Sequence, residues 1–188
     1  MEQLRNLRWP LVMASLAVTV AVLWAGQILV RGAMVDEPVA AYLKSHPAVE
    51  SFAWEETPEG PRLRIALGPV PDLAQVYTDL EEGVRRAARG RAVALVVTDH
   101  RTPGLVTAFY HINPLLQEAL ATGRYGDLVD RVEAAAARLG VERAEVRIDQ
   151  ARVYLQLHHG ADYLYAVLPR PDGPRWPGAE PAPGGWGL

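Results

Sequence analysis

The chain has 188 residues, a formal net charge of −3 and no cysteine. The absence of cysteine excludes disulfide bonds, thiolate metal ligands, a cysteine nucleophile and a lipid-modified cysteine anchor. Charged residues make up 22% of the chain without forming a concentrated basic patch, which argues against a nucleic-acid-binding protein.

Residues 9–30 carry no charged side chain, and Gln27 is the only strongly polar residue among them. At about 1.5 Å per helical residue this stretch spans roughly 33 Å, which matches a hydrocarbon core of about 30 Å. Trp9 stands where an aromatic residue is favoured at the membrane–water interface, and Trp24 lies within the span. The sequence therefore predicts a transmembrane helix at 9–30, with the lipid bilayer as a partner.

A cleaved signal peptide is the alternative to a retained anchor. Its apolar region is usually shorter, at about 7–15 residues, and ends in small residues at positions −3 and −1 of the cleavage site. Cleavage after Ala25 or Gly26 would place Leu23 or Trp24 at position −3, and neither residue is small. We therefore expect the segment to be retained.

The charges around the span predict its orientation. Arg5 and Arg8 precede it, whereas Arg31 follows it and is soon countered by Asp36 and Glu37. Because positive charge favours the cytoplasmic side, we expect residues 1–8 in the cytoplasm and the rest of the chain outside it. The predicted location is thus the cell membrane, as a single-pass protein with an extracytoplasmic domain.

The remaining chain divides into three predicted parts. Residues 31–37 form a juxtamembrane linker, and residues 38–168 form a soluble α/β domain. Residues 169–188 contain six prolines and five glycines, with too few apolar groups to fold, so we expect a disordered tail.

The first part of the domain is predicted to run helix, strand, strand, helix, strand. A short helix ends at His46-Pro47, and strands at 49–55 and 62–67 flank a turn-rich link. Pro71 and Asp72 begin a helix with apolar residues spaced by three and four, and a continuous apolar run at 92–97 fits a buried strand. A strand, a helix and a second strand make a crossover between parallel strands the default.

The second part is predicted to run from helices to strands. Helices are expected at 105–111, at 114–121 with Asn113 as its cap, and at 125–139 with Gly140 as its stop. Alternation then predicts strands at 144–148, 151–157 and 163–167. The predicted fold class is α/β (α+β), a small mixed sheet with helices packed mainly on one face.

The element order of the first part, at 38–97, resembles that of small envelope modules of the BON and ring-building kind. The resemblance is one of element order, and it implies assembly beside a membrane without supplying a site residue.

Candidate sites are few. Asp99-His100-Arg101 follows the presumed central strand, where ligands gather in open α/β sheets; the alternative is a turn closed by Asp99. His100, His111, His158 and His159 are the candidate metal ligands, but neighbours on a strand point to opposite faces and no metal-binding spacing occurs. We therefore predict no catalytic residue, no metal and no cofactor.

The last strands carry arginines and tyrosines that alternate with apolar residues. Burial in the core is expected for four apolar residues: Val146, Ile148, Val153 and Leu155. Because side chains alternate along a strand, the residues between them face away from the core. Tyr and Arg are enriched at protein interfaces. The sequence thus predicts a solvent-facing, partner-binding surface made of four residues: Arg147, Arg152, Tyr154 and Tyr165.

The functional prediction is a membrane-anchored protein-binding or assembly module of the cell envelope, more consistent with a non-enzyme, whose partner is another envelope protein or a second copy. The alternatives are a membrane-tethered metal-dependent hydrolase and a small-molecule sensor domain.

Overall fold

The computed structural model describes residues 37–58, 60–171 and 173. The predicted cytoplasmic segment (1–8) and transmembrane helix (9–30, with Trp9 and Trp24) lie outside the described residues, as do most of the linker and of the tail. Among the residues described, no helix is long and apolar enough to cross a bilayer.

The first lobe, which we define as residues 37–98, holds a three-stranded sheet. A first helix over residues 37–45 precedes strands β1 (Val49–Thr57) and β2 (Gly60–Leu67), helix α2 (Leu73–Ala87) and strand β3 (Ala94–Thr98). The sheet order is β1-β2-β3, with β1 antiparallel and β3 parallel to β2. The predicted crossover between parallel strands is confirmed.

The period-two pattern of β2 explains how this lobe packs. Leu63, Ile65 and Leu67 are buried in the cluster that includes α2, whereas Arg64 is exposed on the opposite face. Helix α2 begins where Asp72 accepts a hydrogen bond from the Gln75 backbone N–H at 3.2 Å, as an N-cap should.

The second lobe, which we define as residues 99–173, places two helices before three strands. Helices α3 (Pro103–Thr122) and α4 (Leu128–Arg138) are followed by β4 (Arg143–Ile148), β5 (Arg152–His159) and β6 (Asp162–Pro169). These strands form an antiparallel sheet in the order β4-β5-β6. Gly140 adopts a φ of 75° at the predicted helix stop.

The prediction of one mixed sheet is wrong, because the described strands form two separate three-stranded sheets. The strands β3 and β6 approach each other at one end only. There the Tyr163 backbone N–H donates to the His100 carbonyl at 3.1 Å, and the Tyr165 N–H donates to the Asp99 carboxylate at 2.7 Å. A loop carbonyl and a side chain thus bind the edge of β6 where a neighbouring strand would otherwise pair.

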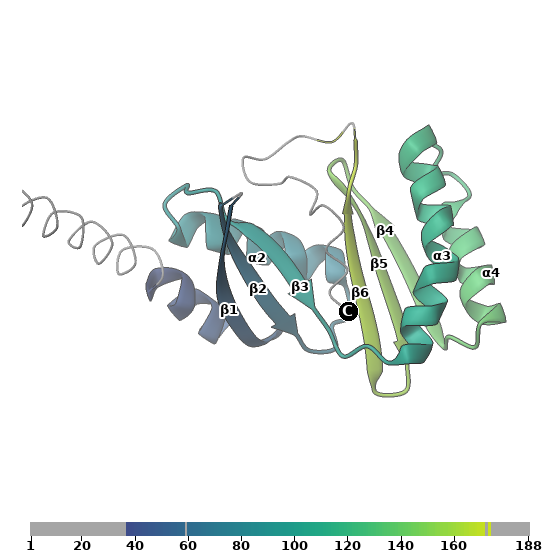
Figure 1. Ribbon diagram of the computed structural model, residues 1–188, viewed down its shortest axis with the longest axis horizontal. Coiled ribbons are helices and arrows are strands. Elements are labelled where there is room, and N and C mark those ends of the chain that lie inside the picture. The colour runs from purple at the N-terminus through teal and green to yellow at the C-terminus, as the bar shows by residue number, and fades with distance from the viewer. Residues whose placement is uncertain (1–36, 59, 172, 174–188) are drawn as a thin grey trace, which may run out of the picture.

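The prediction that helices cover mainly one face also needs correction. Figure 1 shows the β4–β6 sheet between the first lobe and the α3–α4 pair. One face of this sheet contributes Val153, Leu155 and Leu157 to the core with α3 and α4, and the other contributes Tyr154, Tyr163 and Tyr165 to the core of the first lobe. The sheet is therefore buried on both faces.

Helix α3 is a single helix rather than the two helices predicted on either side of Asn113. Pro114 lies inside it, where it lacks the N–H that would bind the Tyr110 carbonyl. Ile112, Leu116 and Ala119 are buried on either side of the proline, so continuous packing along one face offsets the lost hydrogen bond.

Candidate functional site

The four residues predicted to form a partner-binding surface do share one face of the second sheet. Arg147 pairs with Tyr154 across β4 and β5, Tyr154 with Val167, and Gln156 with Tyr165, which places their side chains on the same side. The expectation that this face meets solvent is wrong for three of them, because Arg152, Tyr154 and Tyr165 are buried. Only Arg147 is exposed, with 62% of its side chain accessible.

The covering element is the segment between β2 and α2. The Tyr163 hydroxyl donates to the Leu67 carbonyl at 3.0 Å, and the Tyr165 hydroxyl accepts from the Val70 N–H at 2.9 Å and donates to the Gly68 carbonyl at 3.1 Å. These tyrosines therefore satisfy main-chain groups of the first lobe and do not present a docking surface.

Arg152 joins the second sheet to α2. Its guanidinium makes a bidentate pair with the Glu81 carboxylate at 3.0 and 2.5 Å and lies 4.9 Å from the centre of the Tyr77 ring. Burial alone would lower the pKa of Arg152, but Tyr77 and Glu81 outweigh that effect and raise it. The arginine is held charged inside the boundary between the lobes.

Tyrosines around this pair resist ionisation. Burial raises the pKa of Tyr77 to about 12 against the opposing effect of Arg152. Burial also raises the pKa of Tyr154 to about 12, aided by its hydrogen bond of 2.8 Å to the Asp149 carboxylate. Groups with shifted pKa values mark functional sites as well as structural ion-pair networks, and here every shifted group has a structural partner.

Asp99-His100-Arg101 lies where the two lobes join. The Asp99 side chain is fully buried and forms an ion pair with Arg101 at 2.6 Å. It also accepts a hydrogen bond from the Tyr165 backbone N–H. His100 is exposed and its Nδ1 lies 2.7 Å from the Asp162 carboxylate. The aspartate thus fixes the junction between β3 and β6, a structural role that differs from the local turn expected as the alternative.

The candidate metal ligands do not converge. His100 and His158 both lie beside the Tyr163 ring, at centroid distances of 6.3 Å in each case. His111 is exposed on α3, and His159 is exposed in the hairpin between β5 and β6. Within the described part of the chain, no group of three or more His, Asp or Glu residues is arranged to hold a metal ion. Burial, with the nearby Arg143, lowers the pKa of His158.

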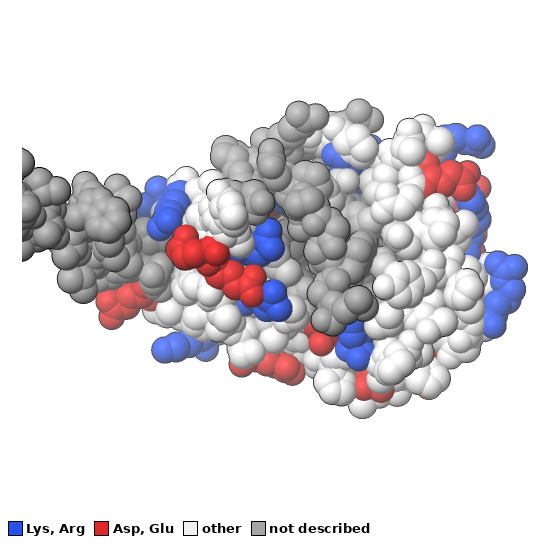
Figure 2. Space-filling view, in the orientation of Figure 1, with Lys and Arg blue, Asp and Glu red and all other residues white. Residues whose placement is uncertain are grey.

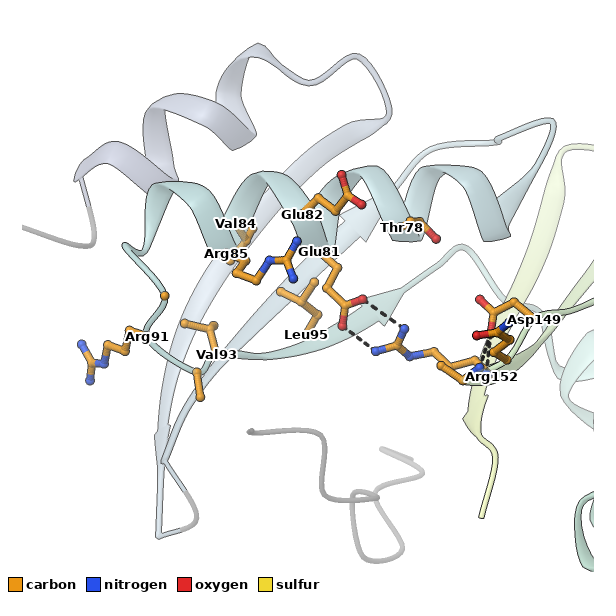
Figure 3. A pocket seen from close by; sticks show the side chains of 14 residues that line it. Thr78, Glu81, Glu82, Val84, Arg85, Arg91, Val93, Leu95, Asp149 and Arg152 are labelled. Carbon is orange, nitrogen blue, oxygen red and sulfur yellow. Dashed lines mark hydrogen bonds and ion pairs between the residues drawn. The ribbon is translucent and has the colours of Figure 1, made fainter. Parts of the chain in front are cut away.

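A cavity of about 400 Å³ lies between α2, β3 and the turn from β4 to β5. In Figure 3, Glu81 and Arg152 point toward one another across it. Leu95 comes from β3, Val93 directly precedes that strand, and Asp149 lies on the turn. Its volume falls in the range of small-molecule sites, and it combines an apolar floor with a few polar groups.

A second feature is the exposed face of α3. No Asp, Glu, Lys or Arg occurs from Pro103 to Gln117, whereas the exposed faces of α2 and α4 carry several. Figure 2 shows this part of the molecule as mainly uncharged atoms. The face is lined by six exposed residues: Pro103, Thr107, Tyr110, His111, Pro114 and Gln117.

Tyr110 is the centre of this face. It is 55% exposed, the most exposed large apolar residue in the described chain. Its carbonyl receives no helical hydrogen bond from residue 114, which is proline. An exposed aromatic ring on a face without formal charge has the composition of a protein interface core.

Sequence reasoning missed Gln156, which contacts both lobes. Its side-chain oxygen accepts from the Leu73 N–H at 2.6 Å and its nitrogen donates to the Val70 carbonyl at 3.2 Å. The residue is 1% exposed. The available signal was its place in the middle of an apolar strand between Leu155 and Leu157.

The chain matches no family model, and neither curated proteins nor solved structures are detectably similar to it.

Proposed function

We propose that this protein is a single-pass membrane protein whose domain lies outside the cytoplasm and binds another protein through the exposed face of α3. The observation that carries the proposal is the run of four helical turns without a charged residue, centred on Tyr110. Charged residues are depleted in interface cores, and tyrosine is enriched there. The anchor and its orientation are supported by the charge-free span at 9–30 and the arginines ahead of it.

The domain has a geometry that suits a tethered binding module. Figure 1 shows the first helix at one end of the molecule and α3 with α4 at the other. A chain anchored ahead of residue 37 would therefore hold the α3 face at the far end from its attachment. We propose an envelope protein or a second copy of the chain as the partner.

Crosslinking in cells tests the docking surface. A photoreactive amino acid replaces Tyr110 in the full chain, and a matched variant carries it at Glu133, which is exposed on α4. We expect a discrete crosslinked product from position 110 and none from position 133. A product of about twice the chain mass of 20.6 kDa, containing only this chain, identifies self-assembly. Equal or absent crosslinking at both positions contradicts the proposal.

Two measurements test the membrane placement. Protease added to spheroplasts should remove the domain, and the untreated chain should migrate at full length rather than shortened by a cleaved signal. Replacing Leu16 and Val20 with arginine puts two charges into the apolar span and should release the chain from membranes. Full protection from protease contradicts the orientation, and release of the unaltered chain by alkaline carbonate contradicts the anchor.

The second candidate is a small-molecule sensor domain, which the cavity between α2 and β3 favours. A compound that raises the Tm of the chain, and no longer does so when Leu95→Arg fills the cavity, would support that function.

A further inference from the structure

The strand β3 has one unpaired edge. It pairs with β2 on one side, no other described strand pairs with its second edge, and that edge faces the second lobe in Figure 1. Such an edge presents a row of backbone N–H and C=O groups. Natural edge strands usually carry charges, prolines or bulges that block pairing, but residues 94–97 are Ala-Leu-Val-Val, all partly exposed.

The edge of β6 that faces β3 differs from the edge of β3, because two of its backbone amides are hydrogen-bonded. The amides of Tyr163 and Tyr165 bind His100 and Asp99 where the two strands approach each other. From that junction β3 and β6 diverge in Figure 1. The arrangement leaves the greater part of the β3 edge without a partner among the described strands.

The cavity described above lies along this same edge. Leu95 of β3, Val93 just before that strand and Val84 of α2 form its apolar side, and residues 149–152 lie across from them. A strand added to β3 would direct alternate side chains toward α2, on the face where Val93 and Leu95 lie. Strand addition takes its affinity from main-chain hydrogen bonds and its specificity from such pockets. A small molecule would fill the pocket but leave the row of backbone groups unbound.

The charge near the start of β3 indicates the polarity of the ligand. Residues 85–91 contain four arginines and no acidic residue, and Arg91 lies three residues before the first residue of β3 and lines the cavity. The acidic residues that line the cavity are Glu81, Glu82 and Asp149; Glu81 is paired with Arg152, and Asp149 accepts a hydrogen bond from the Tyr154 hydroxyl. An acidic side chain beside Arg91 would therefore complement the site.

We propose that the edge of β3 and the adjoining cavity bind an extended peptide segment of a partner protein, with apolar residues at alternate positions and a carboxylate next to Arg91. This site is separate from the α3 face, so either can be present without the other.

Four synthetic hexapeptides test the proposal with the full chain. The parent is acetyl-Asp-Thr-Val-Thr-Val-Thr-amide; two analogues carry N-methyl groups on one or the other set of alternate amides, and the fourth has lysine in place of aspartate. We expect the parent to bind, and one methylated analogue to lose about tenfold or more in affinity while the other retains it, because only one edge of the peptide faces β3. The lysine peptide should bind more weakly than the parent.

Arg91→Glu supplies a charge reversal at an exposed position that leaves the core unchanged. This variant should bind the lysine peptide more tightly than the parent peptide. The control variant Arg138→Glu changes an exposed residue of α4 and should bind the four peptides as the original chain does. Equal binding of both methylated analogues, or no binding by any peptide at millimolar concentration, overturns the proposal. Binding that appears only in a chain ended at residue 173 assigns the edge to the chain's own C-terminal segment and also overturns it.

Discussion

Gln156 accepts the backbone N–H of Leu73 at 2.6 Å, so a side chain of β5 binds the first residue of α2 across the boundary between the lobes. Its amide nitrogen also donates to the Val70 carbonyl. The contact is fully buried and joins segments 83 residues apart in the sequence.

Gln156→Met should therefore lower the free energy of unfolding by about 2–4 kcal/mol, because it leaves two buried main-chain groups unpaired while keeping the volume similar. Urea unfolding of the purified chain measures the change. Gln150→Met, at an exposed position, is the matched control and should change stability by less than about 0.5 kcal/mol. Equal effects of the two substitutions would show that the amide of Gln156 contributes nothing specific.

The Glu81–Arg152 pair should show strong energetic coupling. Only 9% of the Arg152 side chain is exposed, and removal of one partner leaves the other charge poorly solvated. We expect Arg152→Met to cost about 2–4 kcal/mol, and the double variant with Glu81→Met to cost at least about 1 kcal/mol less than the sum of the singles.

The surface pair Arg64–Glu55 serves as the comparison for that cycle. Its side chains are 49% and 35% exposed, so its coupling should stay below about 1 kcal/mol. Similar coupling energies for the two pairs would mean that burial does not strengthen the pair between the lobes.

The first helix should depend on Gly83. A Cβ at this position of α2 would lie 2.0 Å from the Tyr42 ring, whose hydroxyl donates to the Asp79 carbonyl at 2.9 Å. Gly83→Ala should displace Tyr42 and destabilise the chain, although alanine favours a helix over glycine by about 1 kcal/mol. Adding Tyr42→Ala should restore stability relative to the single variant.

Gly126→Ala is the control for that substitution, because a Cβ there would meet nothing within 4 Å. Thermal unfolding measures all three variants. A gain in Tm for Gly83→Ala alone would refute close packing of the first helix on α2.

Stability should fall steeply in alkali. The pKa values of Tyr77, Tyr154 and Tyr165 are about 12 in the folded chain, above the ordinary value of 10. The unfolded chain therefore loses these protons first, and their contribution is complete below pH 10 and is lost as pH rises from 10 through 12. Each tyrosine contributes up to about 1.4 kcal/mol per pH unit.

Denaturant unfolding at several pH values, with tyrosinate absorbance as a second signal, checks this dependence. Tyr165→Phe should make the decline between pH 10 and 12 shallower, because one of the three shifted groups is removed. Unchanged stability over that interval would contradict the raised pKa values.

Local patterns in the sequence predicted the elements well. Alternation in 62–67 and 144–157 identified the strands and the faces that their side chains share, and Asp72 and Gly140 marked helix ends. These features depend on residues close in sequence, so a local pattern is sufficient to find them.

The pattern did not reveal what covers each face. Arg152, Tyr154 and Tyr165 alternate with valine and leucine as surface residues do. Arg152 and Tyr165 nevertheless bind groups far away in the sequence, namely Glu81 and the main chain at Gly68 and Val70. The ring of Tyr154 packs against the distant Tyr77, while its hydroxyl binds the nearby Asp149. Pro114 led to the prediction of two helices because a proline inside a helix removes one hydrogen bond. The helix continues through it, because burial of Ile112 and Leu116 offsets that loss.

The side-chain hydrogen bonds from β5 and β6 to residues 67–73 have a consequence for synthesis on the ribosome. Residues 67–73 emerge early, but the partners that bind their main chain follow 83 to 97 residues later. A nascent first lobe therefore exposes those amides and carbonyls, together with the apolar side of α2, until nearly the whole domain has been translated. The first lobe can complete its packing only when β6, the last of the described strands, has been translated. A chain that stalls before Tyr165 leaves the main-chain groups of Gly68 and Val70 without their hydrogen-bond partner.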